Sequence, residues 1–597
     1  MSSINLENLT IPKSTNCRFL LSACPELESV TLPKNATIIH SLIFGECSKL
    51  KNVDIPDTVT TIGYEAFRGC TSLESITIPD SVKRIGNCAF FNCPDLKSII
   101  IPDSIKKISK CTFQYCTGLK SVTLPSSLKT IGKNAFYNCS SLESITIPAS
   151  VETIGDSAFR QCKNLTDVNI QNDPTNTTST ASLKTIGPNA FKDCEKLKNI
   201  NIPDSVTRIG ESAFMSCTSL ERLTLPDSVT RIENEAFASC ERLKNITIPD
   251  SVTDIGSEVF NGCTSLESIT LPDFITRIDY RAFGSCKGLK NITIPDSLYY
   301  IGAHAFDGCE SLENITLPDS ITEIDSFVFH GCQSLKSMII PDSVTAIHSD
   351  AFKKCSSLES IKIPESVDSI EWNAFKGCKN LKDITIPNSV TLIDLSVFEN
   401  CESLEHIKLP ERVTEIRNSA FEGCRSLKNI TIPDAVKSIS SYAFSECKSL
   451  KSITLPDSLY YIGEHAFNNC ESLGHIKLPD SIDNIYNNTF AGCSSLEYIT
   501  IPDAVKSIGS YAFSECKSLE NLEIPYGVTD IGFMAFYNCK NLKNITIPTS
   551  LNYINSYAFS ECESLETVTI ISDCTSKIID VRELDLDTMD QWIFLYF

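Results

Sequence analysis

A unit of 23 residues recurs through almost the whole of this 597-residue chain, and one copy occupies residues 203–225 (PDSVTRIGESAFMSCTSLERLTL). Its cysteine lies 23 residues from the next one everywhere except between Cys162 and Cys194, and a leucine follows each of these cysteines three residues later. A phenylalanine precedes the cysteine by three residues from Phe44 onward. A fixed period of this length indicates a solenoid, because each unit can bury its apolar face only against its neighbours. The sequence therefore predicts one elongated domain of about 24 coils.

The apolar spacing inside one unit predicts its local structure. Positions i, i+1, i+4 and i+7 are apolar, which predicts a short helix, as at Ala236, Phe237, Cys240 and Leu243. Ile246 and Ile248 alternate with polar residues and predict a strand that Pro249 ends, because proline has no amide hydrogen. Val252 and Ile255 predict a second short strand. The expected fold is α/β: a right-handed solenoid with a parallel sheet and short helices.

Departures from the repeat suggest how the chain is divided. Residues 1–24 read as a degenerate N-terminal capping coil, and residues 25–570 as the solenoid. Residues 172–181 add turn-forming and hydroxyl side chains and predict a loop insertion. Residues 571–597 lose the period, become acidic and then aromatic, and predict a C-terminal cap or tail.

The 28 cysteines resemble a disulfide framework until their spacing is considered. Twenty-four occupy one repeat position, between Phe and Leu, where a small buried hydrophobe fits, so we expect reduced core thiols. Parallel stacked side chains suit disulfide geometry poorly. Cys88 and Cys111 differ, because they share another slot on adjacent coils that should be exposed. They could form a disulfide in an oxidising location or stay free in a reducing one.

The repeated phrase LxxIxIPxxVxxIGxxAFxxC resembles the leucine-rich repeats over residues 4–570, specifically the BspA-like class of bacterial and parasitic-protist surface proteins. One departure is that serine mostly replaces the usual turn asparagine, as at Ser205, Ser251 and Ser343. The resemblance implies a leucine-rich-repeat solenoid acting as a surface adhesin or antigen, which binds host or matrix macromolecules through its sheet face. Composition and spacing by themselves predict only a protein-binding scaffold.

Composition and the absence of targeting signals leave a second cellular location possible besides the cell surface. The formal net charge of −22 argues against nucleic acid as a partner, because that interaction rests on Lys/Arg clusters. The first residues show no basic-then-apolar signal segment, and no apolar run reaches about 18 residues, so no membrane span is expected. These features favour the alternative of a cytoplasmic protein-interaction scaffold. The oligomeric state and the identity of the protein ligand are left open.

The outward residue of the predicted strand is mostly threonine, which suits an exposed sheet position. Charged and aromatic exceptions gather toward the C-terminal half and are the candidate ligand-binding residues: Lys362, His406, Lys408, His475, Lys477, Tyr498 and Glu523. Propensity alone explains the threonines, whereas the exceptions favour a surface that discriminates a ligand.

Two further rows have competing interpretations. Asp follows Pro in seven consecutive units from Asp204 to Asp342, which favours ordinary turn chemistry over a row of calcium ligands. The residue after each repeat leucine alternates in sign, as in Glu221 and Lys244, which favours structural register over a docking strip. The seven scattered histidines form no HExxH motif, and the glycines form no phosphate loop, so we expect no enzyme and no cofactor.

Overall fold

The computed structural model describes residues 3–5, 21–172, 181–555, 557–571 and 576–580. Most of the predicted capping coil, residues 173–180 of the predicted insertion and the tail beyond residue 580 lie outside this part of the chain. The chain divides into two compact units, Met1–Glu310 (unit 1) and Ser311–Phe597 (unit 2).

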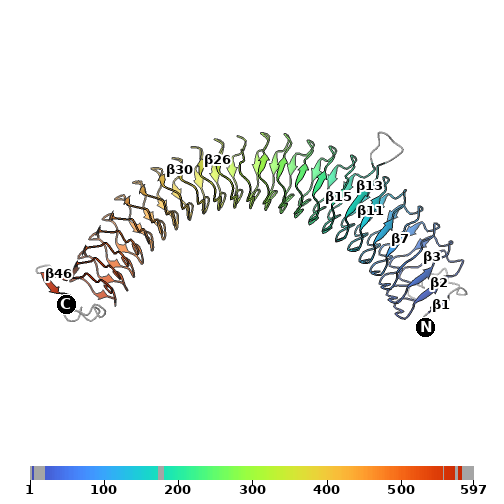
Figure 1. The fold of residues 1–597 in the computed structure, drawn as a ribbon, viewed down its shortest axis with the longest axis horizontal. Helices are drawn as coiled ribbons and strands as arrows, with labels where there is room; N and C mark the ends of the chain where they lie inside the picture. Colours follow the sequence, from blue (N-terminus) through green and yellow to red (C-terminus); the bar gives the residue numbers. More distant parts are fainter. Residues whose placement is uncertain (1–2, 6–20, 173–180, 556, 572–575, 581–597) are drawn as a thin grey trace. The chain divides into compact units, whose positions relative to one another are not determined.

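The chain winds into about 23 parallel-stranded turns, and most turns contribute two short strands (Figure 1). The first strand of a turn usually has three residues and belongs to the long-strand series; the second has two and belongs to the short-strand series. The middle residue of a long strand is buried between two exposed ones, as in Asn245–Thr247, which confirms the predicted alternation. The exposed side chains of the two series define the long-strand face and the short-strand face.

In unit 1 the long-strand series comprises β1 (Ser3–Asn5), β2 (Ser29–Thr31), β4 (Asn52–Asp54), β7 (Ser98–Ile100), β9 (Ser121–Thr123), β11 (Ser144–Ile147), β13 (Asp167–Ile170), β15 (Asn199–Ile200), β17 (Arg222–Thr224), β19 (Asn245–Thr247), β21 (Ser268–Thr270) and β23 (Asn291–Thr293). Its short-strand series comprises β3 (Ile38–Ile39), β5 (Thr61–Ile62), β6 (Arg84–Ile85), β8 (Lys107–Ile108), β10 (Thr130–Ile131), β12 (Thr153–Ile154), β14 (Thr185–Ile186), β16 (Arg208–Ile209), β18 (Arg231–Ile232), β20 (Asp254–Ile255), β22 (Arg277–Ile278) and β24 (Tyr300–Ile301).

In unit 2 the long-strand series comprises β26 (Ser337–Ile339), β28 (Ser360–Lys362), β30 (Asp383–Thr385), β32 (His406–Lys408), β34 (Asn429–Thr431), β36 (Ser452–Thr454), β38 (His475–Lys477), β40 (Tyr498–Thr500), β42 (Asn521–Glu523), β44 (Asn544–Pro548) and β46 (Thr567–Ile571), followed by β47 (Ser576–Asp580). Its short-strand series comprises β25 (Glu323–Ile324), β27 (Ala346–Ile347), β29 (Ser369–Ile370), β31 (Leu392–Ile393), β33 (Glu415–Ile416), β35 (Ser438–Ile439), β37 (Tyr461–Ile462), β39 (Asn484–Ile485), β41 (Ser507–Ile508), β43 (Asp530–Ile531) and β45 (Tyr553–Ile554).

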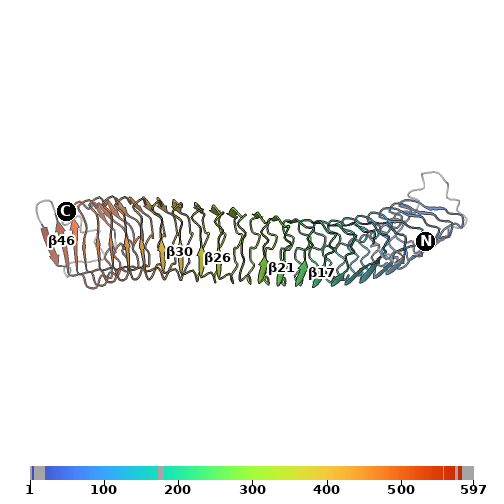
Figure 2. The same cartoon turned by 90° about the horizontal axis from the view of Figure 1, so that it is seen from above.

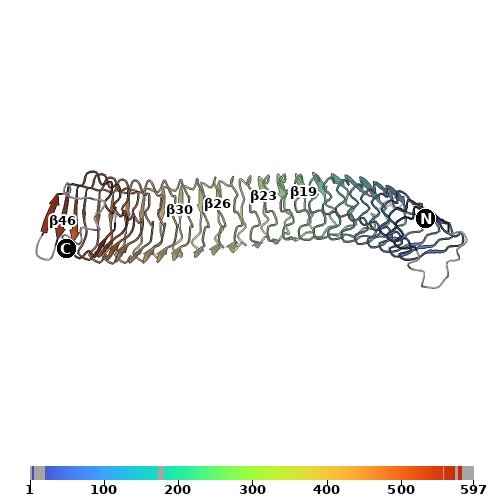
Figure 3. The same ribbon diagram turned by 90° about the horizontal axis from the view of Figure 1, so that it is seen from below.

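Within each series, neighbouring strands pair in parallel, and each residue lies beside the equivalent residue of the next turn. Arg222 pairs with Asn245 in β17 and β19, and Asp254 pairs with Arg277 in β20 and β22. Figure 2 labels β17 and β21 of unit 1, which are separated in the sheet by β19, and Figure 3 labels β19 and β23 of the same sheet from the other side. The last pair differs, because β47 runs antiparallel to β46 and ends the parallel ladder.

The helical part of the α/β prediction is wrong: the described residues contain no helix. Residues 236–243 instead form successive turns, because Glu235 and Ser239 adopt positive φ values of 57°. Left-handed residues at this spacing are incompatible with a continuous right-handed helix. The amide of Phe237 donates to the carbonyl of Val259 in the next coil at 3.0 Å, whereas a helix would direct it back along its own coil.

The repeat phenylalanines and cysteines form the centre of the core. Phe237 lies stacked between Phe214 and Phe260, with ring centroids 5.7 Å apart on each side and interplanar angles of 10° and 13°. The predicted burial of the cysteine row is confirmed except at Cys24, which is half-buried. The thiol of Cys240 also donates to the carbonyl of Phe214, the phenylalanine one coil earlier, whereas Cys47 donates to Leu21, which replaces the phenylalanine at the start of the row.

A serine ladder fixes the turn between the two strands. The amide of Val252 donates to the carbonyl of Pro249 at 3.0 Å and closes the predicted turn. The hydroxyl of Ser251 donates across the coils to the carbonyl of Val229 at 2.5 Å, and Ser205 makes the equivalent bond to Leu183 at 2.6 Å. Serine therefore satisfies a carbonyl of the neighbouring coil where asparagine serves in the usual leucine-rich repeat.

Candidate binding face

The candidate ligand-binding residues all lie in unit 2 on the long-strand face. Each is the first or third residue of a strand whose buried middle residue anchors it, so its side chain is exposed. His475 pairs with Tyr498, and Lys477 pairs with Thr500 in the next strand. Glu523 follows one strand later in β42 and pairs with Thr546. The structure therefore brings four of the seven candidates together on three consecutive strands: His475, Lys477, Tyr498 and Glu523.

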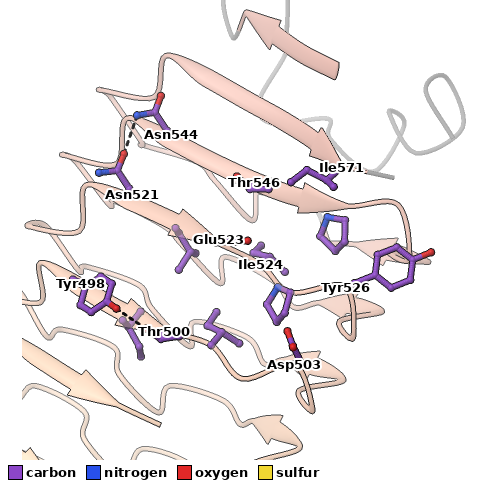
Figure 4. A pocket seen from close by; sticks show the side chains of 15 residues that line it. Tyr498, Thr500, Asp503, Asn521, Glu523, Ile524, Tyr526, Asn544, Thr546 and Ile571 are labelled. Atoms are coloured by element: carbon purple, nitrogen blue, oxygen red, sulfur yellow. Dashed lines mark hydrogen bonds between the residues drawn. The ribbon is translucent and has the colours of Figure 1, made fainter. Parts of the chain in front are cut away.

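A hollow of about 790 Å³ lies on this part of the face (Figure 4). Tyr498 and Tyr526 lie at opposite ends of the hollow, with Glu523 and Ile524 between them. Tyr498 is 60% exposed and Tyr526 is 53% exposed. The hydroxyls of Tyr498 and Thr500 are hydrogen bonded at 2.8 Å. The amide of Asn544 donates to Asn521 at 2.8 Å, which orders the rim farther along the strands. The hollow thus combines exposed aromatic rings with positioned polar groups.

Tyr526 belongs to the hollow and was missed by the sequence analysis. It occupies the turn position that aspartate usually holds, in the sequence Pro525-Tyr526-Gly527. A Cβ atom at Gly527 would lie 2.1 Å from the carbonyl oxygen of Asp503, so only glycine allows this turn to lie against its neighbour. The substitution of Pro-Tyr-Gly for Pro-Asp-Ser was the available signal in the sequence.

The charges around the hollow have both signs. Lys477 and His475 lie on the strand preceding Tyr498, whereas Glu523 and Asp503 line the hollow itself. All four side chains are exposed, so their interactions with one another are screened by water and salt. The mixture suits a polar, partly charged ligand surface better than a uniformly charged polymer.

The remaining candidates lie apart from this hollow. Lys408 lines a second hollow of about 460 Å³ together with Glu411, Asn429, Thr431 and Asp434. His406 is in the same strand as Lys408, β32, three turns before β38. Lys362 lies in β28, two turns earlier still. The seven candidates therefore form a discontinuous strip rather than one site.

The site offers binding groups, and no metal-ligating cluster is found among the residues that the structure describes. No group of three or more His, Cys, Asp or Glu side chains is placed there to hold an ion. The aspartates after proline, such as Asp250, lie exposed on separate turns, one in each coil. Within the described residues no helix has the length and hydropathy needed to cross a bilayer.

The expectation that the Cys88 and Cys111 slot is exposed is wrong. Cys88 is half-buried and Cys111 is only 6% exposed, because the predicted helix is replaced by turns packed between coils. Both thiols are free, and they lie close enough to interact. Burial, followed by the charge of Cys111 and a hydrogen bond to it, raises the pKa of Cys88 to about 11.

Alternating charges produce ion pairs between some coils. Lys428 contacts Glu405 at 2.5 Å, and Lys382 contacts Glu359 at 3.7 Å. These side chains are roughly half exposed, so water and salt screen each pair and its contribution to the stability of the stack is small. Their position on neighbouring coils supports the structural interpretation of the alternation.

Comparison of the sequence with protein families gives matches to the BspA type leucine rich repeat region in six copies, over residues 1–97, 89–181, 173–290, 278–404, 368–497 and 483–580. The chain belongs to the BspA-type leucine-rich repeat family. The resemblance seen in the repeat phrase is therefore confirmed. A search of curated proteins gave no match.

Several solved structures are similar to this BspA-type protein. A leucine rich cell surface protein from Faecalibacterium prausnitzii is 30% identical, covering 59% of this chain and 88% of that one, with a TM-score of 0.36. A leucine-rich repeat protein from Bacteroides ovatus is 26% identical, covering 91% and 92%, with a TM-score of 0.22. The pneumococcal vaccine antigen PcpA is 20% identical, covering 55% and 79%, with a TM-score of 0.31.

Proposed function

We propose that this chain is a non-enzymatic binding scaffold whose long-strand face in unit 2 binds a protein ligand, and that it acts at a cell surface as an adhesin or antigen. The hollow between Tyr498 and Tyr526 is the observation that carries the proposal. Two exposed tyrosines beside charges of both signs resemble the centre of a protein interface, where tyrosine is enriched and contributes strongly to affinity.

The buried middle residues of β40 and β42 make this face a rigid platform. Ile499 and Leu522 are 4% and 3% exposed, so the outward side chains are fixed on a packed core. A preorganised face loses little conformational entropy when it binds. The surface location rests on the resemblance to BspA-like proteins, for which binding of host or matrix macromolecules is the expected role.

Binding can be tested with immobilised purified matrix proteins as probes and the full chain in solution. For any probe that binds, Tyr526→Ala and Tyr498→Ala should each weaken binding about tenfold or more, as expected for residues at the centre of an interface. Tyr553→Ala is the matched control, because Tyr553 is 49% exposed but lies in β45 on the short-strand face. Equal losses in all three variants would contradict the assignment of the site.

Location is tested separately by biotinylation of intact cells with a membrane-impermeant reagent. Labelling of the chain before lysis is expected for a surface protein. Labelling only after lysis would contradict the surface proposal and favour the alternative of an intracellular protein-interaction scaffold.

A further inference from the structure

The short-strand face of unit 1 carries a cluster of exposed cations in a protein whose net charge is −22. The cluster, which we call the cation patch, comprises Lys83, Arg84, Lys106, Lys107 and Lys110. It spans the turns of β6 and β8. None of the five forms an ion pair with a carboxylate in residues 21–172, and this distinguishes them from most cations on the same face.

Equivalent arginines elsewhere in unit 1 have an internal counterion. Arg208 and Arg231 contact Glu233 at 2.9 and 2.7 Å, and Arg277 contacts Asp279 at 3.0 Å. In each case the acid occupies the position directly after a short strand. The same position is Gly86 after β6 and Ser109 after β8. The cation patch therefore lacks the acid that neutralises the other arginines.

A hollow of about 330 Å³ lies beside the patch, and no carboxylate lines it. Its polar lining comprises His40, Ser41, Thr61, Tyr64, Arg84, Asn87 and Ser109. The hydroxyl oxygen of Ser41 accepts a hydrogen bond from the backbone amide of Tyr64 at 3.2 Å, so the hydroxyl hydrogen of Ser41 remains available to a ligand. A Cβ atom at Gly86 would lie 2.6 Å from the backbone of Gly63, so the base of the hollow stays bare.

The acidic side chains near the patch either form an ion pair with another residue or lie in turns at the edges of the patch. Glu65 is buried and contacts Arg68 at 3.0 Å. Asp80 and Asp103 lie in the turns that precede β6 and β8. One coil beyond the patch, Lys129 contacts Glu152 at 2.8 Å, so pairing of cations resumes there. The exposed cations of the patch therefore gather on the two coils of β6 and β8, beside the hollow.

We propose that the cation patch and its hollow bind a sulfated polysaccharide, with one sulfate in the hollow against Arg84 and further sulfates along Lys106, Lys107 and Lys110. Coils about 4.8 Å apart present cations at the close spacing of sulfates on a highly sulfated sugar chain. Guanidinium and ammonium groups supply charge-assisted hydrogen bonds to sulfate oxygens, while the hydroxyl and amide side chains suit sugar hydroxyls. This ligand is additional to the protein ligand proposed for unit 2.

The lining favours a polysaccharide over nucleic acid. Single-stranded nucleic acid is held by several aromatic side chains on which successive bases stack, in addition to cations. Tyr64 and His40 are the ring side chains of this hollow's described lining, so the hollow offers few platforms for stacked bases.

The test uses heparin as the probe, the full chain, and titrations at about 50 and 150 mM salt. The chain should bind, its affinity should fall as salt rises, and Lys106→Glu/Lys107→Glu should weaken binding about tenfold or more. Arg84→Gln, which changes the hollow with little change in total charge, should also weaken it. Lys244→Glu/Lys290→Glu is the matched control, because it changes the charge equally at exposed positions of unit 1 and should change affinity less than about twofold.

Chemically desulfated heparin should fail to bind, and a single-stranded RNA of the same charge should bind more weakly than heparin. Equal losses in the two double variants, binding of the desulfated chain, or tighter binding of RNA would each overturn the proposal. Tyr498→Ala/Tyr526→Ala should leave heparin affinity unchanged, so failure of this proposal is separable from failure of the protein-binding function. Unchanged thermal unfolding of each variant shows that a loss reflects the surface and not the fold.

Discussion

The thiol of Cys240 donates a hydrogen bond to the backbone carbonyl of Phe214, one coil earlier, with sulfur and oxygen 3.2 Å apart. The same carbonyl accepts a hydrogen bond from the backbone amide of Cys217 at 3.1 Å, so it is bonded to a donor of its own coil and to a donor of the next coil. Equivalent bonds recur along both units, for example from Cys263 to Phe237 and from Cys493 to Phe467. The cysteine row therefore links successive coils through hydrogen bonds while filling the core.

Burial of these thiols predicts low reactivity and alkaline sensitivity. Burial raises the pKa of Cys240 from its usual 9.0 to about 12, so the folded state disfavours the thiolate. The resulting stabilisation is complete below about pH 9 and is lost as the pH rises through about 12. We expect chemical unfolding to require progressively less guanidinium above pH 9. A thiol reagent should label Cys240 only after unfolding, and its rapid labelling in the folded protein at pH 8 would contradict this.

Phe237→Ala should destabilise unit 1 locally by about 3–5 kcal/mol, because the rings of Phe214 and Phe260 cannot close the cavity. Hydrogen exchange should accelerate mainly in the coils beside Phe237, since each coil contacts only its neighbours. Phe274→Ala is the control, because Phe274 is 64% exposed and should cost less than about 0.5 kcal/mol. Uniform loss of protection throughout unit 1 would be inconsistent with a one-dimensional stack.

Three coils of unit 2 meet at His348. Its Nδ1 lies 2.9 Å from Glu371 and its Nε2 lies 3.3 Å from Glu323. Burial lowers the pKa of His348, but the hydrogen bonds and charges of the two glutamates outweigh it, so the pKa lies above 6.5. For Glu371, burial is outweighed by hydrogen bonds from Ser349 and His348, and the pKa lies below 4.5.

These shifts have opposite signs in their effect on stability. The contribution of His348 to the free energy of unfolding is complete below about pH 6.5, and it is lost as the pH rises through the elevated pKa of His348. The contribution of Glu371 is complete above about pH 4.5 and is lost as the pH falls through its lowered pKa. His348→Gln should therefore destabilise unit 2 by about 0.5–1 kcal/mol more at pH 5.5 than at pH 8.5. His406→Gln, at an exposed position, is the control in the same denaturation series; an equal pH dependence in both variants would argue against the cluster.

The period of the sequence was sufficient to predict the solenoid, the buried Phe and Cys rows and the outward strand residues, because these depend on apolar spacing. The helix at 236–243 was wrong because the same spacing also fits turns whose amides bond to the next coil, as at Phe237. The position before the repeat cysteine held the missed signal: it is often glycine or asparagine, as at Gly262 and Asn92, both with positive φ. The hollow at Tyr526 depends on how adjacent turns stack, which a single repeat does not encode.

Cys88 and Cys111 are predicted to form a disulfide in an oxidising compartment. Their coils are joined by hydrogen bonds, including one from the amide of Cys88 to the carbonyl of Lys110 at 2.9 Å, and their thiols already interact. Because the pKa of Cys88 is raised to about 11, its attack on oxidised glutathione should be slow at pH 7 and faster as the pH rises toward that value. Cys111 then displaces glutathione from the mixed disulfide, and Cys88→Ser should abolish the product.

Non-reducing peptide mapping of protein from its native source tests whether Cys88 and Cys111 are bridged. A Cys88–Cys111 peptide would support the oxidising surface location, whereas two freely alkylated thiols would contradict the bridge and favour the intracellular alternative.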